Sequence, residues 1–151
     1  MGEATKDKYE SIRLDNQLCF PLYACSKEVI RQYRKPLEEL NLTYTQYIVM
    51  MVLWEHGEIT EGEIGQKLHL DSGTLTPLLK RLEKQGLLIR FRSKHNERKL
   101  YLKLTEEGEA LKDKATGIQC KMLNFINLTD DEAVELKRLL NRALTQMENR
   151  Q

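Results

Sequence analysis

One strand-like segment among otherwise helical patterns is the feature that most constrains how this chain can fold. Residues 87–104 (LLIRFRSKHNERKLYLKL) end with Leu100, Leu102 and Leu104, which alternate with Lys99, Tyr101 and Lys103. Alternation with a period of two is typical of a half-buried strand. The polar residues 93–97 in the middle of the segment predict the tip of a hairpin. Because the rest of the chain shows no second strand signal, we expect a mainly α-helical fold with one hairpin.

Helix-start signals organise the remaining sequence. The capping-box pattern, Ser or Thr followed three residues later by Glu or Gln, occurs at residues 43–46, 60–63 and 129–132, and it satisfies unpaired N–H groups at a helix start. Gly57 and Gly86 stand where C-terminal caps belong. Apolar spacing predicts helices over residues 12–34, 43–56, 60–69, 73–85, 105–126 and 130–148, with a short helical turn near 36–40.

The order of these elements predicts a winged helix-turn-helix. A capped helix over 60–69 is followed by a tight turn through residues 70–72, a second helix up to Gln85 and then the hairpin. We therefore predict a DNA-binding region over residues 43–104. The flanking regions, 1–42 and 105–151, contain long amphipathic helices that a wing domain does not need. We expect them to form a homodimer, which would present two recognition helices about one DNA turn apart.

Charge is concentrated in the predicted winged region. Residues 72–103 contain nine Lys and Arg against Glu83 and Glu97, so this stretch carries +7 while the whole chain carries only +1. A basic field on an otherwise acidic chain indicates a polyanionic partner bound by one face. Hydroxyls near a helix N-terminus approach base edges and phosphates, and arginines on a wing suit the minor groove. The residues predicted to contact duplex DNA are Ser72, Thr74, Thr76, Lys80, Arg81, Arg92 and Arg98.

Composition excludes several other classes of protein. The chain has 151 residues, 40% of them hydrophobic and 31% charged, which favours one globular domain. It has no apolar run near the ~20 residues of a membrane span, and its first residues lack the apolar core of a signal peptide, so we expect a cytoplasmic protein. There is no Cys-x-x-Cys pair, and His56, His69 and His95 are not spaced as metal ligands. We predict no cofactor and no metal.

Cys19 lies in an apolar stretch, residues 14–33 (LDNQLCFPLYACSKEVIRQY), and admits two interpretations. A free cysteine most often packs as a small hydrophobe. If Asn16 caps the first helix, however, Cys19 is its third residue, where unpaired N–H groups and the helix dipole favour a thiolate. Tyr23 and Tyr33 share its helix face and would donate hydrogen bonds to the charged form. On the residues alone, both interpretations stay open.

Cys25 lies on the apolar stripe of the same helix and is predicted to be a core residue. It cannot bridge to Cys19 on an intact helix, because six residues rise ~9 Å and bridged Cα atoms lie within ~7 Å.

The whole chain resembles the MarR (multiple antibiotic resistance regulator) family. The resemblance rests on LDSGTLTPLLKRLEKQGLL and on NERKLYLKLTEEG in the wing. The segments LDNQLCFPLYACSKEVIRQY and LTYTQYIVMMVLWE look like its organic-hydroperoxide-sensing branch. The wing departs from the family's usual Asp-x-Arg, because this chain has Asn96, Glu97 and Arg98. Asn96 can still support the turn, but an ion pair to Arg98 is in doubt.

The resemblance also implies roles for particular residues. It makes Cys19 the peroxide sensor and makes Tyr33 and Tyr44 of the partner subunit hydrogen-bond donors to its thiolate. Some members of this branch resolve the oxidised sensor with a second cysteine, a role that would fall to Cys120. The alternative end states are a sulfenate and a mixed disulfide with a small thiol.

Three functions follow as hypotheses. The first is a transcriptional repressor that binds a pseudo-palindromic operator as a homodimer and releases it when organic hydroperoxides oxidise Cys19. The second is a MarR-type regulator released by a phenolic or other small ligand, with Cys19 structural. The third is a thiol peroxidase, which shares the first oxidation step. A resolving motif next to Cys19 is missing and a basic wing does not serve turnover, so we predict that the protein is not an enzyme.

Overall fold

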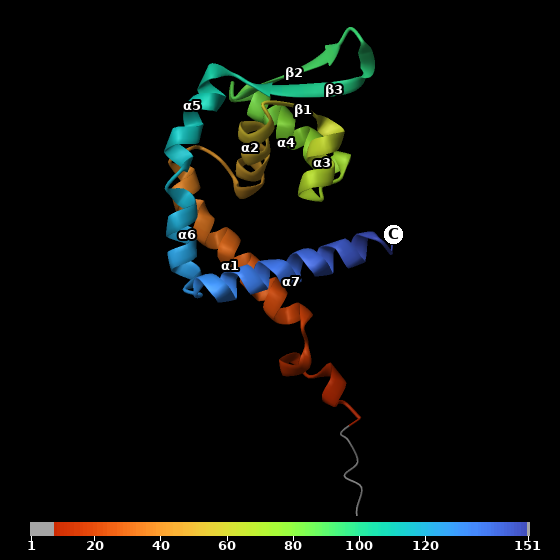
Figure 1. The fold of residues 1–151 in the computed structure, drawn as a ribbon, viewed down its shortest axis with the longest axis vertical. Coiled ribbons are helices and arrows are strands. Elements are labelled where there is room, and N and C mark those ends of the chain that lie inside the picture. The colour runs from red at the N-terminus through yellow and green to blue at the C-terminus, as the bar shows by residue number, and fades with distance from the viewer. Residues whose placement is uncertain (1–7, 151) are drawn as a thin grey trace, which may run out of the picture. The chain divides into compact units, whose positions relative to one another are not determined.

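The computed structural model describes residues 8–150 and divides the chain into two compact units (Figure 1). The first, here called the winged-helix unit, ends at Thr116, and the second, the C-terminal unit, begins at Gly117. The predicted fold class is confirmed, since the fold is mainly helical with one small antiparallel sheet. The elements of the winged-helix unit are α1 (Cys19–Glu38), α2 (Tyr44–His56), β1 (Glu58–Thr60), α3 (Glu61–Leu68), α4 (Ser72–Lys84), β2 (Leu88–Ser93), β3 (Asn96–Leu104) and α5 (Glu106–Ala115). Those of the C-terminal unit are α6 (Ile118–Ile126) and α7 (Asp130–Glu148).

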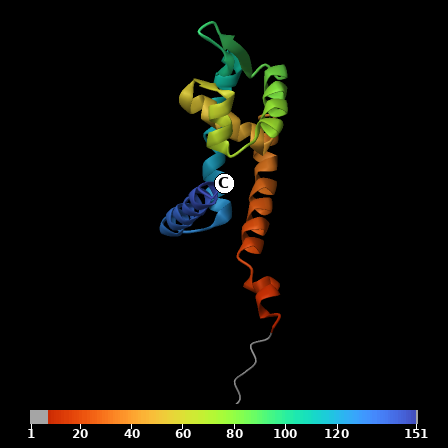
Figure 2. The same cartoon turned by 90° about the vertical axis from the view of Figure 1, so that its right-hand side faces the viewer.

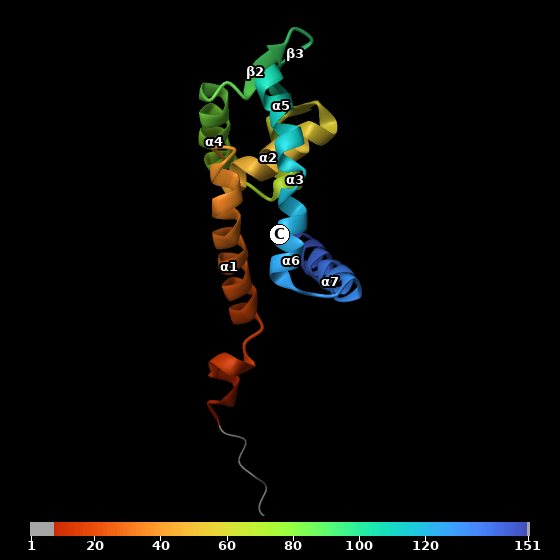
Figure 3. The same ribbon diagram turned by 90° about the vertical axis from the view of Figure 1, so that its left-hand side faces the viewer.

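The sheet has three strands in the order β1-β3-β2, all antiparallel. The predicted hairpin is confirmed as β2 and β3, and in all three ribbon views it lies at the end of its unit away from the start of α1 (Figures 1, 2 and 3). The expectation of a single strand signal was wrong, because β1 pairs with β3 through Ile59 and Leu102. Three residues are too few for a visible alternation, so only the partner strand reveals β1.

The core of the winged-helix unit joins its helices to the sheet. The largest fully buried side chains all come from this unit: Leu37, Val49, Met50, Leu53, Ile64, Leu75, Leu79, Leu82, Leu88 and Leu102. Removing a leucine or isoleucine of this kind from water contributes ~1.5–3 kcal/mol. This core therefore holds α2, α3 and α4 against the sheet without help from another chain.

The turn between α3 and α4 depends on two backbone features. His69 ends α3 in the left-handed region, with φ of 53°. At Gly65, an added Cβ would lie only 2.9 Å from the carbonyl oxygen of Leu70, so a side chain there would force the turn open. Asp71 then caps α4 by accepting a hydrogen bond from the Thr74 backbone N–H at 2.8 Å. These features fix the angle at which α4 leaves α3.

The first helix begins later and ends later than predicted. It spans Cys19–Glu38 instead of residues 12–34, and the predicted turn near 36–40 is partly its last turn. Side chains compete with helix formation before Cys19: Asn16 Nδ2 donates to the Glu10 carbonyl and Gln17 Nε2 to the Ser11 carbonyl, both at 2.7 Å. Such bonds offer the backbone an alternative to a helix, and two short 3-10 turns replace it.

The predicted helix over 105–126 is two helices in the structure. α5 ends at Ala115 and α6 begins at Ile118. Glycine in a helix interior costs roughly 0.5–1 kcal/mol relative to alanine, and Gly117 lies at the break. The Thr116 hydroxyl donates to the Asp113 carbonyl at 2.8 Å, which also favours an end at this point. The break coincides with the boundary between the two units.

Candidate nucleic-acid interface and thiol site

The two sides of α4 differ in burial. Leu75, Leu78, Leu79 and Leu82 are buried on one side. The exposed residues include Ser72, Thr74, Lys80, Arg81 and Lys84. We call the seven predicted contact residues the DNA face. They are Ser72, Thr74, Thr76, Lys80 and Arg81 from α4, and Arg92 and Arg98 from the wing. Ser72 and Thr74 lie at the exposed N-terminal end of the helix, where the Asp71 carboxylate already accepts from the Thr74 N–H, so the side-chain hydroxyls are the polar groups that this end offers to DNA.

Two threonine hydroxyls of the DNA face are already hydrogen-bonded within the chain. Thr76 Oγ1 donates to Glu61 Oε1 at 2.5 Å, which links α4 to the first residue of α3. Thr74 Oγ1 donates to Asp71 Oδ2 at 3.3 Å. Thr76 is half-buried, whereas Thr74 is exposed. Both hydroxyls therefore keep their oxygen lone pairs, but not their protons, for a partner.

The wing, formed by β2 and β3, holds its arginines in different ways. Arg92 and Arg98 are both exposed. Arg92 Nη1 donates to the Glu97 carbonyl at 2.8 Å, and Asn96 Oδ1 accepts from the Arg98 backbone N–H at 3.3 Å. The asparagine thus supports the turn, as expected. Arg90 is bound to Glu83 at 2.9 Å, so one of the nine cations counted in this region is neutralised within the unit.

Cys19 is exposed and is the first residue of α1. The condition that Asn16 caps this helix is not met, because Asn16 Nδ2 donates to the Glu10 carbonyl and the residue before Cys19, Leu18, provides no side-chain cap. Cys19 therefore lies two positions nearer the helix start than expected. It remains within the first turn, where N–H groups lack intrahelical partners and the dipole favours negative charge.

A cluster of three tyrosines, Tyr33, Tyr44 and Tyr47, lies where α1 packs on α2. The ring centroids of Tyr33 and Tyr44 are 4.9 Å apart, and those of Tyr33 and Tyr47 are 5.9 Å apart. Burial raises the pKa of all three hydroxyls above the ordinary value of 10.0. A tyrosine is protonated near neutral pH even at its ordinary pKa, and burial shifts the pKa further in that direction, so each phenol retains an O–H that can donate.

Cys19 and this cluster cannot meet within one chain. Tyr33 follows Cys19 by fourteen residues on the same helix, a rise of about 21 Å at ~1.5 Å per residue. Tyr44 lies against Tyr33 and is therefore far from Cys19 as well. Any contact between the thiol and these hydroxyls requires a second copy of the chain.

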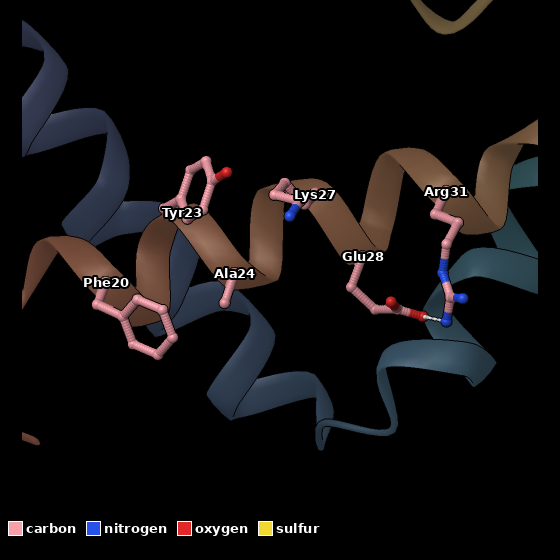
Figure 4. A pocket seen from close by; sticks show the side chains of 6 residues that line it. All are labelled: Phe20, Tyr23, Ala24, Lys27, Glu28 and Arg31. Atoms are coloured by element: carbon pink, nitrogen blue, oxygen red, sulfur yellow. Dashed lines mark hydrogen bonds and ion pairs between the residues drawn. The ribbon is translucent and has the colours of Figure 1, made fainter. Parts of the chain in front are cut away.

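The surface of α1 after Cys19 is open (Figure 4). Phe20, Tyr23, Ala24 and Lys27 line a hollow of about 440 Å³ together with Glu28 and Arg31. The Lys27 ammonium lies 5.0 Å from the centre of the exposed Tyr23 ring. Figure 4 also shows the ion pair between Glu28 and Arg31, at 2.7 Å.

The other two cysteines are also exposed and free. The prediction that Cys25 is a core residue was wrong for the single chain, because the apolar stripe of α1 is not covered by other residues of this chain: Leu18 and Leu22 are exposed too. Cys120 lies on α6, whose buried residues are Ile118 and Met122. Its thiol is accessible to a reagent or to another chain.

A second cleft, of about 580 Å³, lies between α1 and the start of α2. It combines an apolar floor, from Leu37 and Leu42, with cationic side chains. Its lining residues that bear charge or a hydroxyl are Lys27, Arg31, Arg34, Glu38, Thr43 and Tyr44.

Within residues 8–150, no group of three or more His, Cys, Asp or Glu could hold a metal ion. No helix in the same range is long and apolar enough to cross a membrane.

Comparison with known proteins identifies the family. Residues 31–115 match the model of the transcriptional regulators SarA/Rot. The organic hydroperoxide resistance transcriptional regulator of Bacillus subtilis is 45% identical over 89% of this chain and 92% of its own length. The chain belongs to the MarR family, in its organic-hydroperoxide-resistance branch. The regulator SarZ of Staphylococcus aureus is another relative of this MarR-family chain, with 42% identity over 84% of the chain and 86% of SarZ.

Solved structures agree with this assignment. Reduced AbfR bound to DNA superimposes with a TM-score of 0.77 at 36% identity, covering 93% of this MarR-family chain and 98% of AbfR. The disulfide-formed state of AbfR matches with a TM-score of 0.60 at 34% identity, covering 94% of each chain. The relatives are transcriptional regulators with a DNA-binding fold, not enzymes.

Sequence reasoning missed three residues that organise the MarR-family site. Glu61 is bound to Thr76 across fifteen positions of sequence, and no local pattern signals that pairing. Buried Gln46 donates from Nε2 to Gln85 Oε1 at 3.3 Å, and Gln85 Nε2 donates to the Asn41 carbonyl at 2.9 Å. This pair of amides ties the segment before Tyr44 to the end of α4. The Asp71 cap, by contrast, was recognisable as an Asp directly before the apolar spacing of α4.

Proposed function

We propose that this protein is a cytoplasmic, homodimeric transcriptional repressor that binds duplex DNA through its DNA face and releases it when organic hydroperoxides oxidise Cys19. Its relatives support the class of regulator, since one is named for organic hydroperoxide resistance and another was solved on DNA in reduced form. The basic side of α4 and the exposed wing arginines fit a polyanion. The protein does not turn over peroxide as an enzyme, because its cysteine chemistry serves DNA release.

The observation that carries the proposal is the separation of the exposed Cys19 thiol from Tyr33 on the same helix and from Tyr44, which packs against Tyr33. Cys19 and Tyr33 lie seven residues on either side of Ser26. Two α1 helices packed antiparallel about a two-fold axis at Ser26 would therefore put Cys19 of one copy opposite Tyr33 of the other. Tyr44 of that other copy would lie there too, because its ring lies against Tyr33. A dimer thus completes two equal sites, each with a thiol from one copy and phenol donors from the other.

Uncovered apolar surface supports the dimer. Leu18, the residue directly before α1, and Leu22 on α1 are exposed, as are Leu136, Leu139 and Leu140 on α7. Exposed apolar faces of this extent mark interaction sites on soluble proteins. A two-fold dimer would cover both helices and would present two α4 helices to a pseudo-palindromic operator.

The chemistry at Cys19 follows from thiolate reactivity. The thiolate attacks the terminal oxygen of the hydroperoxide, the O–O bond breaks, and the alkoxide leaves as an alcohol after taking a proton. The two electrons lost by sulfur reduce the peroxide, and the cysteine becomes a sulfenic acid. The Cys120 thiol of the second copy then attacks that sulfur, which forms a disulfide and expels water. A relative, AbfR, has been solved in a disulfide-formed state, which supports a disulfide as the end state.

Oxidation must act on DNA through domain spacing, since Cys19 lies on α1 and the DNA face on α4 and the wing. Oxidised sulfur no longer accepts the same hydrogen bonds from Tyr33 and Tyr44, so the balance between two arrangements of the dimer shifts. Moving the recognition helices off their half-sites weakens both sets of contacts together. A loss of ~3 kcal/mol reduces affinity more than 100-fold.

The test compares DNA release by four proteins after equal cumene hydroperoxide: wild type, Cys19→Ser, Cys120→Ser and the matched control Cys25→Ser. We expect wild type and Cys25→Ser to lose affinity for a selected operator by about 100-fold, a change of about 2.7 kcal/mol. Cys19→Ser should keep its affinity, and Cys120→Ser should form no covalent dimer on a non-reducing gel. Full release by the Cys19→Ser protein would contradict the redox mechanism.

The cleft beside Tyr44 supports a second candidate function, a regulator released by a small ligand. Its apolar floor and cationic side chains suit an aromatic acid. Release of DNA by salicylate in the Cys19→Ser protein would favour this candidate. Unchanged affinity at millimolar salicylate would exclude that ligand class.

A further inference from the structure

The hydroxyl protons of Thr74 and Thr76 are directed at carboxylates of the same chain. Thr76 Oγ1 donates to Glu61 Oε1 at 2.5 Å and Thr74 Oγ1 to Asp71 Oδ2 at 3.3 Å. A hydroxyl has one proton to donate and two lone pairs that accept. With the proton engaged, the threonine oxygen can meet a partner only as an acceptor.

Bases differ in what they offer to an acceptor in the major groove. Adenine presents the N6 amino group and cytosine the N4 amino group, whereas guanine and thymine present carbonyl oxygens at the corresponding positions. A free threonine hydroxyl contacts either kind of base, because it rotates to donate or to accept. A threonine held by a carboxylate loses that freedom and matches only an amino group.

We propose that Glu61 is a specificity-determining residue: by holding the Thr76 hydroxyl as an acceptor, it makes α4 select adenine or cytosine on the strand that Thr76 faces, and so fixes the orientation of the base pair beneath Thr76. The inference rests on the proposed DNA-binding function and deepens it. Glu61 acts through Thr76 and is a positioning residue. It belongs to α3, and the side-chain partners of the capping box at this helix start are Thr60 and Glu63, so Glu61 is free for this task.

The Glu61 carboxylate also affects the overall affinity for DNA, and this effect is unfavourable. Phosphates repel a negative charge beside the DNA face, so Glu61 lowers affinity for all DNA while it sharpens the choice of base. Removing it should therefore raise binding to unrelated duplexes and weaken discrimination at one position. Loss of a purely structural contact would lower affinity for every sequence together and would leave the base preference unchanged.

The experiment selects sequences from a pool of random 30-base-pair duplexes with four reduced proteins: wild type, Glu61→Ala, Thr76→Val and Glu58→Ala. Glu58→Ala is the matched control, because it removes a nearby exposed carboxylate on β1 that has no bond to α4. Wild type and Glu58→Ala should select the same consensus. Glu61→Ala and Thr76→Val should both lose the adenine or cytosine preference at the same two symmetry-related positions.

Affinities on the selected duplex give the size of the effect. Replacing the selected base by guanine or thymine should weaken wild type about tenfold, a typical cost for one lost base contact, and the Glu61→Ala protein at most about twofold. An unchanged consensus for Glu61→Ala, or a failure of Glu61→Ala and Thr76→Val to lose their preference at the same positions, would overturn the inference. Failure of wild type to enrich any sequence would instead overturn the proposed DNA-binding function.

Discussion

α2 and α7 begin in the same way and end up in different surroundings. Each starts with a complete capping box, from Thr43 and Gln46 in α2 and from Thr129 and Glu132 in α7. Each carries apolar residues at helical spacing. Yet α2 buries six residues, including Val49, Met50 and Leu53, while α7 buries none of its nineteen. Because local sequence makes both helices, the difference lies in what covers them: α2 packs in the core of its own unit, whereas the apolar face of α7 stays uncovered in this chain.

Truncating a leucine in each helix gives the largest contrast. Leu53 is 0% exposed, and Leu53→Ala should lower the free energy of unfolding by about 2–5 kcal/mol at every protein concentration, because it leaves a cavity. Leu139 is 46% exposed, and Leu139→Ala should cost stability only where the dimer is populated. Urea unfolding at several protein concentrations separates the two. A loss for Leu139→Ala that is independent of concentration would place its side chain in a single-chain core.

A charge introduced on the exposed apolar face of α7 tests whether this helix forms the dimer interface. Leu140→Glu should dissociate the dimer, because a carboxylate cannot be buried unpaired in an apolar interface. Operator affinity should then fall at least about 100-fold, since two linked half-sites commonly gain ~10²–10⁴ over one. Sedimentation equilibrium and fluorescence anisotropy measure the two effects.

Thr145→Glu is the matched control, because it introduces the same charge opposite the apolar stripe of α7. It should leave both the dimer and the DNA affinity unchanged. A dimeric Leu140→Glu protein would show that α7 does not form the interface.

The matched capping boxes should differ in where their loss is felt. Thr60→Ala removes the cap of α3 in the winged-helix unit and should lower its free energy of unfolding by about 1 kcal/mol. Thr129→Ala removes the same cap from α7 and should instead weaken the dimer, leaving the unfolding of the dilute monomer nearly unchanged. Hydrogen exchange of the two helices reports each loss locally. Equal effects on the unfolding of the monomer would argue against the contrast between the winged-helix unit and α7.

The smallest effect concerns pH. The hydrogen bond from the Arg90 side chain holds the pKa of Glu83 below its usual range, and this pair joins α4 to β2. A carboxyl whose pKa is lower in the folded state contributes stability above its unfolded pKa of about 4.3, and that stability is lost as the pH falls towards the folded value. The free energy of unfolding, measured from pH 7 down to pH 3, should therefore fall less steeply in the Arg90→Gln protein than in wild type.

The corresponding pair in α7 makes the pH test a comparison. The Arg138 side chain likewise lowers the pKa of Glu135, but both residues belong to one helix and are exposed. Arg138→Gln should leave the pH dependence of the winged-helix unit unchanged. A weaker pH dependence of the free energy of unfolding in the Arg138→Gln protein would mean that α7 unfolds together with the winged-helix unit.

Much of the fold could be predicted because its signals are local. Capping boxes at Thr43, Thr60 and Thr129 start helices where expected, and Gly57 and Gly86 have the positive φ that ends them. The alternation of leucines along β3 correctly predicted the hairpin. Each of these features depends on residues a few positions apart, so the sequence contains them in full.

The candidate site was predictable in its residue types but not in its connections. The basic side of α4 was foreseen, whereas the residues alone left open whether Cys19 packs or reacts, and the roles of both remain predictions. The start of α1 was placed too early, because the side chain of Asn16 bonds backward to Glu10 instead of capping the helix. Polar side chains near a helix end have several local partners of similar energy, and the sequence does not rank them.

By itself, the sequence determined the helices that begin with a capping box, the hairpin, the charge of the winged region and the family. Only the tertiary structure decided that β1 is a strand, that Thr76 is bound to Glu61, that Gln46 reaches Gln85, and that the apolar faces of α1 and α7 stay uncovered. The physical reason is range: propensities, caps and periodicity act within one or two turns of chain. Strand pairing, side-chain bonds across elements and burial depend on which surfaces the folded chain brings together.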